Sequence, residues 1–98
     1  KNGSEGDFNF LLNHFKSEPL SQNKMMSSMA FAKYLVTVKN KENIRKGVDE
    51  IMKFRNQVPE EYRGYIDPGY KNTFSKISAA QKADGNSDLA DYIDGLIK

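Results

Sequence analysis

The side chains of this chain that could do chemistry are few. The 98 residues include one histidine, His14, and no cysteine. A zinc site takes His, Cys or carboxylate ligands in register, so His14 would need distant carboxylates to complete one. A Ser–His–acid triad would also depend on His14, and no glycine-framed serine turn accompanies it. We therefore interpret His14 as a residue at the surface or at the edge of an apolar face, and a small enzyme that uses it is the weakest alternative.

Carboxylates occur in two adjacent pairs, Asp49–Glu50 and Glu60–Glu61. Neighbouring residues on a helix point about 100° apart, so neither pair converges on a bond as the two acids of a glycosidase do. We interpret both pairs as solvated or helix-terminal charges. The runs GVDE, GYID and DPGY lack the glycine spacing of a phosphate-binding loop. No catalytic, cofactor or metal-binding residue is predicted in this chain.

Tyrosine and arginine are concentrated near the middle of the chain, around two prolines. The residues are Arg55, Tyr62, Arg63, Tyr65 and Tyr70. Protein interfaces favour both residue types. Two interpretations stay open: the tyrosines close the end of a helical stack, or this segment is a contact surface for another domain or a peptide.

Helices must position these side chains, because apolar residues recur at three- and four-residue steps along most of the chain. We expect helices over residues 8–16, 22–38, 41–56 and 68–84, a last helix from 86 or 87 onward, and a short turn or helix at 60–63. The predicted helix starts and stops follow from cap chemistry. The expected N-caps are Asp7, Ser21, Asn40 and Asp67, and the expected stops are Gly64 and Gly85.

The helix over 41–56 is the most clearly marked. Ile44, Val48, Ile51 and Met52 form its predicted buried stripe, and Arg55 continues that face. Gly47 in its middle costs roughly 1 kcal/mol relative to Ala, which indicates that a neighbouring helix passes close by.

The preceding helix, over 22–38, contains three methionines on its predicted packing face. They are Met25, Met26 and Met29. Thioether side chains fill irregular gaps between helices, so core packing is the favoured interpretation, with a partner groove as the alternative.

The net charge is +2, with acids and bases interleaved. The electrostatic field of such a nearly balanced charge distribution favours neither nucleic acid nor a membrane surface as a partner. No apolar run approaches the roughly 20 residues of a membrane span, there is no signal-peptide pattern, and no compartment is predicted. The chain begins without Met, with KNGSEG. We therefore expect residues 1–6 to be a flexible linker, and 7–98 to be a single helical domain, a fragment of a larger protein.

The run SQNKMMSSMAFAKYLVTVKNKENIRKGVDEIMKFRNQVPEEYR resembles the C-terminal helical region of zinc aminopeptidases of the aminopeptidase N family. The similarity spans about Phe8–Arg63 and is carried by Ser27–Leu35 and by a following helix that ends in a polar turn. It implies a HEAT-like array of paired helices that caps the active-site chamber and restricts substrate entry.

The zinc motif HExxH and the substrate-anchoring motif GAMEN of that family are absent from this chain. The resemblance therefore places zinc in the parent enzyme and carries no catalytic or metal residue over to this sequence. Some members of the family bind a peptide carboxylate with an arginine of this region, but neither Arg55 nor Arg63 matches closely enough to take that role.

Taken together, the patterns predict an all-α domain of five to six short helices in an antiparallel array, either a HEAT-like α-solenoid fragment or a small bundle. The predicted function is that of a non-catalytic C-terminal helical domain of a zinc aminopeptidase-like metallopeptidase. The alternative is a helical-repeat module for protein–protein interaction. The predicted partners are other domains of the parent chain or a separate protein or peptide.

Overall fold

A computed structural model describes residues 5–96. Within them the chain forms five helices and no strand, which confirms the predicted all-α class. The helices are α1 (Glu5–Ser17), α2 (Gln22–Leu35), α3 (Lys41–Gln57), α4 (Glu60–Ala83) and α5 (Ser87–Asp94). No helix of this described part is long and apolar enough to cross a membrane.

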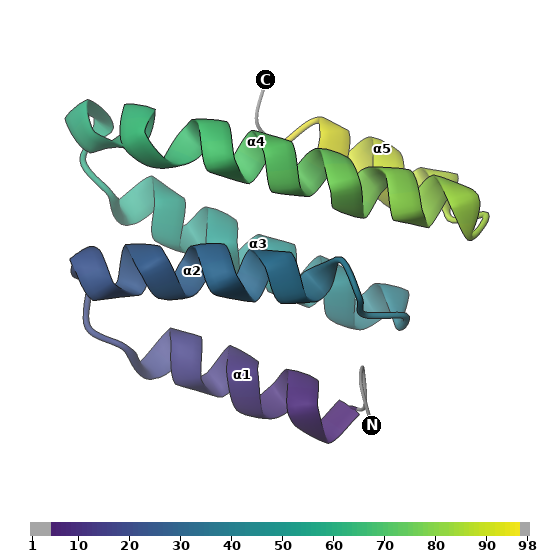
Figure 1. Ribbon diagram of the computed structural model, residues 1–98, viewed down its shortest axis with the longest axis horizontal. Helices are drawn as coiled ribbons and strands as arrows, with labels where there is room; N and C mark the ends of the chain where they lie inside the picture. Colours follow the sequence, from purple (N-terminus) through teal and green to yellow (C-terminus); the bar gives the residue numbers. More distant parts are fainter. Residues whose placement is uncertain (1–4, 97–98) are drawn as a thin grey trace.

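The helices form a thin slab, 36 × 30 × 15 Å in extent. Figure 1 shows α2 and α4 in front, α3 and α5 behind them, and α1 at the edge beside α2. Consecutive helices reverse direction, so α2 and α4 run parallel to each other and α3 runs antiparallel to both. The start of α4 and the start of α2 therefore lie at the same end of the slab.

Helix α3 contributes the predicted buried stripe. Ile44, Val48 and Ile51 are fully buried, whereas Met52 is only half-buried. Phe54 was not part of the predicted stripe, yet it is buried and packs edge-on against Phe15 of α1, with ring centroids 5.8 Å apart. Helix α3 thus contacts α1 and α2 as well as the C-terminal helices.

Gly47 marks a close approach of two helices, as predicted. A Cβ added at Gly47 would lie 2.7 Å from Cδ2 of Leu35, a buried side chain of α2. Any larger residue at this position would push α2 and α3 apart.

Two of the predicted N-caps are confirmed. The hydroxyl of Ser21 accepts a hydrogen bond from the backbone N–H of Lys24 (3.3 Å). The side-chain oxygen of Asn40 accepts from the N–H groups of Glu42 and Asn43, at 2.9 and 3.1 Å. Both helices therefore begin where the sequence predicts.

The N-cap prediction for Asp7 is wrong, because α1 begins at Glu5 and Asp7 lies inside its first turn. An acid is favoured both as an N-cap and within the first helical turn, so the sequence signal does not separate the two positions. Residues 5 and 6 of the predicted linker belong to α1, and residues 1–4 lie outside the described residues.

The predicted break before residue 68 is also wrong. Helix α4 is continuous over 24 residues, with Pro68 inside it, so Gly64 does not end a helix and Asp67 does not cap one. Proline removes one helical hydrogen bond and crowds the carbonyl four residues earlier, here that of Gly64. Both residues are exposed, so no buried contact is lost at this point.

The end of α2 differs from the prediction, whereas the end of α4 agrees with it. Helix α2 ends at Leu35, three residues before the predicted end, and Val38 N–H donates to the Leu35 carbonyl in a final turn. Gly85 has a φ of +84°, a left-handed conformation that favours glycine, and it ends α4 as predicted.

The methionines of α2 differ in burial. Met25 and Met29 are partly buried against the core, but Met26 is 67 % exposed. Since Met26 lies on the outer side of α2, the prediction that it packs inside is wrong for this residue.

Candidate contact surface

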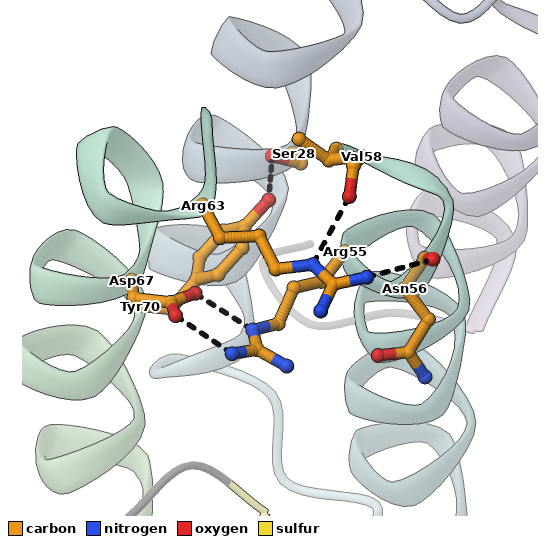
Figure 2. Close-up of polar contacts among 7 residues, drawn as sticks. All are labelled: Ser28, Arg55, Asn56, Val58, Arg63, Asp67 and Tyr70. Carbon is orange, nitrogen blue, oxygen red and sulfur yellow. Dashed lines mark hydrogen bonds and ion pairs between the residues drawn. The ribbon is translucent and has the colours of Figure 1, made fainter. Parts of the chain in front are cut away.

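The structure divides the five predicted interface residues into two groups. Two arginines and one tyrosine make contacts inside the domain, and two tyrosines are exposed. Arg55, Arg63 and Tyr70 form the first group, while Tyr62 and Tyr65 form the second. Figure 2 shows the first group where the end of α3 meets the beginning of α4.

Arg55 of α3 binds Asp67 of α4 through two parallel hydrogen bonds. The Nε–Oδ1 and Nη2–Oδ2 distances are both 2.7 Å, and about four-fifths of each side chain is buried (20 and 21 % exposed). The hydrogen bond from Arg55 holds the pKa of Asp67 below its usual value, although burial opposes this shift. The sequence predicts Asp67 only as a cap, because its partner lies twelve residues away on another helix.

Arg63 reaches back from α4 to the end of α3 (Figure 2). Its Nε donates to the carbonyl of Val58 (3.0 Å) and its Nη2 to the carbonyl of Asn56 (3.1 Å). The last carbonyls of a helix have no partner within the helix, and a cation near them is favourable. Arg63 therefore closes the α3–α4 connection.

Tyr70 is fully buried and belongs to the core. Its hydroxyl lies 2.5 Å from Oγ of Ser28 in α2, and Ser28 itself donates to the carbonyl of Met25 at 2.7 Å. Since the single hydroxyl proton of Ser28 is used there, Tyr70 is the donor to Ser28. Burial raises the pKa of Tyr70 to about 12, so the phenol stays protonated and joins α4 to α2.

Tyr62 and Tyr65 lie on the outer side of α4 and are 46 and 80 % exposed. They are three residues apart, and Glu61 precedes Tyr65 by four, so the three side chains are neighbours on one helix face. Glu61 is also exposed.

Met26 is an exposed residue of the neighbouring helix α2. Helices α2 and α4 are parallel and touch at Met29 and Gly69, where an added Cβ would overlap the methionine's terminal methyl group. Met26 and Tyr65 lie about one turn before these two contact residues, so they are at the same level. We call Met26, Glu61, Tyr62 and Tyr65 the α2–α4 surface.

The side chains that could be catalytic or bind a metal do not lie together in the structure. His14 is exposed beside a shallow groove of about 140 Å³ between α1 and α2. Ser27 lines the same groove, but its hydroxyl donates to Glu18 (2.6 Å). Among residues 5–96, no group of three or more His, Cys, Asp or Glu side chains could hold a metal ion.

The paired acids also have separate environments. Asp49 accepts a hydrogen bond from the Tyr92 hydroxyl of α5, whereas Glu50 forms an ion pair with Lys53 (3.4 Å). The hydrogen bond to Asp49 is the main cause that raises the pKa of Tyr92. Asp49 therefore helps to attach α5 to α3.

No family model matches the chain, and neither a curated protein nor a solved structure matches it. The resemblance to the C-terminal region of zinc aminopeptidases therefore stays a prediction.

Proposed function

We propose that this chain is a non-catalytic helical domain that acts by contact, and that the α2–α4 surface meets its partner. The observation that carries the proposal is the 80 % exposure of Tyr65, together with the exposure of Tyr62 on the same helix and of Met26 at the same level of α2. Tyrosine is one of the residue types enriched among the few residues that dominate the binding energy of an interface.

The surface is also held in place before any partner binds. Arg55 and Arg63 tie the first turns of α4 to α3 and to its C-cap residue Val58 through four hydrogen bonds. A tyrosine has only two side-chain torsions, so ordering it costs little conformational entropy. A rigid scaffold with rigid side chains lowers the entropic cost of association.

The sequence resemblance supports one particular partner, the remaining domains of a zinc aminopeptidase-like parent chain. In that form of the proposal, the domain shapes or caps the substrate chamber, and zinc is held by the parent. In the alternative form, the domain is an interaction module and its partner is a separate protein or peptide.

Photo-crosslinking in the native host tests the proposal. A benzoylphenylalanine replaces Tyr65 in one variant and Lys82 in a matched control, because Lys82 is exposed near the opposite end of the same helix. We expect a discrete crosslink from position 65 and none from position 82. Mass spectrometry then places the crosslink on the same polypeptide or on another protein.

A crosslink to a segment with HExxH in the same polypeptide would support the aminopeptidase form, and a crosslink to a separate protein would support the interaction module. Equal, diffuse crosslinking from positions 65 and 82 would contradict the proposed contact surface.

A further inference from the structure

Within residues 5–96, an arginine stacks on a tyrosine next to a carboxylate where α3 meets α5. The guanidinium carbon of Arg45 lies 4.1 Å from the ring centroid of Tyr92, whose hydroxyl donates to Asp49. Arg45 and Asp49 are one turn apart on α3, while Tyr92 belongs to α5. This combination of a ring, a cation and an anion attaches one helix to another.

The α2–α4 surface offers the ring and the carboxylate without the cation. Tyr65 and Glu61 are one turn apart and exposed. The nearby arginines are used elsewhere: Arg63 binds the end of α3, and Arg55 binds Asp67. Within residues 5–96, no ion pair involves Glu61.

We propose that the α2–α4 surface binds an arginine side chain of a partner segment, an inference that rests on the proposed contact function. The guanidinium covers the ring of Tyr65 and pairs with the carboxylate of Glu61. A planar guanidinium can stack on a ring and also donate two parallel hydrogen bonds to a carboxylate, which a lysine ammonium cannot do. An apolar residue beside the arginine contacts Met26 and Tyr62.

Charge complementarity identifies this partner chemistry. Glu61, in the first turn of α4, is exposed and supplies the negative charge of this surface, whereas Glu60 points about 140° away from Tyr65 around the helix. The electron-rich faces of two tyrosines attract a cation as well. An acidic partner segment would meet repulsion from both sources, and an uncharged apolar segment would leave Glu61 without a partner.

Titration of the ¹⁵N-labelled domain with two short peptides tests the inference. One is an acetylated and amidated tetrapeptide, Leu-Arg-Arg-Leu, and the other is its citrulline analogue, which has nearly the same shape and no charge. We expect the arginine peptide to shift the amide signals of residues 60–66 and to bind about tenfold more tightly, the combined size of an exposed cation–π contact and a surface ion pair.

Three variants locate the contact. Tyr65→Ala should reduce the preference for arginine about threefold, whereas Tyr65→Phe should keep most of it, since the ring face and not the hydroxyl makes the contact. Glu61→Gln should reduce the preference about threefold and weaken its dependence on salt. Asp91→Asn, a matched change at an exposed position of α5, should leave binding unchanged.

The outcomes separate the inference from the proposed function. Equal binding of both peptides at residues 60–66 would overturn the choice of arginine and leave the contact surface standing. Arginine-dependent shifts confined to α5, or no shift at 10 mM peptide, would also overturn the inference. The crosslinking result at position 65 decides the contact function independently of either peptide.

Discussion

The two halves of α4 are held in different ways, although they form one helix. The second half, from Tyr70 onward, is attached through buried side chains that include Phe74 and Ile77. The first half is attached mainly at its edges, through the contacts of Asp67 and Arg63 with α3. Only Ile66 is a buried apolar residue before Tyr70 in this helix.

The two kinds of attachment show that a helix can be fixed in position while some of its aromatic side chains stay in water. Hydrophobic attachment buries the rings that provide it, as with Tyr70 and Phe74, which stack with centroids 6.0 Å apart. Polar attachment at the helix edge needs no ring, so Tyr62 and Tyr65 stay available.

Ile77→Ala should cause a large loss of stability. Ile77 is fully buried in the second half of α4, and removing its methyl and methylene groups leaves a cavity that costs about 2 to 4 kcal/mol. Urea denaturation measures the free energy of unfolding. Ser75→Ala, an exposed change on the same half, is the control. A loss below about 1 kcal/mol would mean that hydrophobic packing does not dominate this half.

Arg55→Met should cost less, about 1 to 3 kcal/mol, because it leaves the carboxylate of Asp67 partly buried without its partner and solvent still reaches about a fifth of the side chain. A double-mutant cycle with Asp67→Asn isolates the interaction of the two side chains. Purely additive losses would show that the pair does not hold the first half of α4.

Pro68→Ala should raise the free energy of unfolding by about 2 kcal/mol. The change restores a helical hydrogen bond and removes the crowding between the two halves, a gain of roughly 3 kcal/mol that is reduced because alanine makes the unfolded chain more flexible. The midpoint of thermal unfolding measures the gain. A decrease would show that the proline ring itself makes a stabilising contact.

The pH dependence should follow the Arg55–Asp67 pair. The pKa of Asp67 is lowered in the folded protein, so its contribution is complete above the unfolded value of about 3.9 and is lost as the pH falls through the folded value. The stability difference between the natural protein and Arg55→Met should therefore shrink between pH 5 and pH 2. A difference that stays constant over this interval would contradict the assignment.

Tyr65→Ala should have the smallest effect on stability, less than about 0.5 kcal/mol, since the side chain is 80 % exposed. The buried Tyr70→Ala is the contrast and should cost about 3 to 5 kcal/mol. If both changes destabilise the domain equally, the first half of α4 is attached through its rings and the division into two modes of attachment is wrong.

Local chemistry made much of the fold predictable. Ser21 and Asn40 cap helices because their side-chain oxygens reach N–H groups two or three residues ahead. Gly85 ends α4 for a reason that lies within one residue, its left-handed backbone. Gly47 predicted a close neighbour, but only the structure identified Leu35 as that neighbour.

The errors occurred where distant residues decide the outcome. Pro68 and Gly64 are local signals for a break, yet α4 continues across them, and its residues nearby contact distant partners, Tyr70 with Ser28 of α2 and Asp67 with Arg55 of α3. The candidate surface was predicted incompletely for the same reason. Composition placed five Tyr and Arg side chains in one group, and only their contacts with distant residues separate the buried ones from the exposed ones.

The sequence by itself determined the all-α class, the positions of most helices and the two caps, since hydrogen bonds over three or four residues and apolar periodicity are encoded locally. The tertiary structure alone decided which rings and cations are free. Tyr70 meets Ser28 across 42 residues and Arg55 meets Asp67 across 12, whereas Tyr65 meets nothing that buries it. Whether a side chain is covered depends on which helices pack beside it, and that is a property of the whole fold.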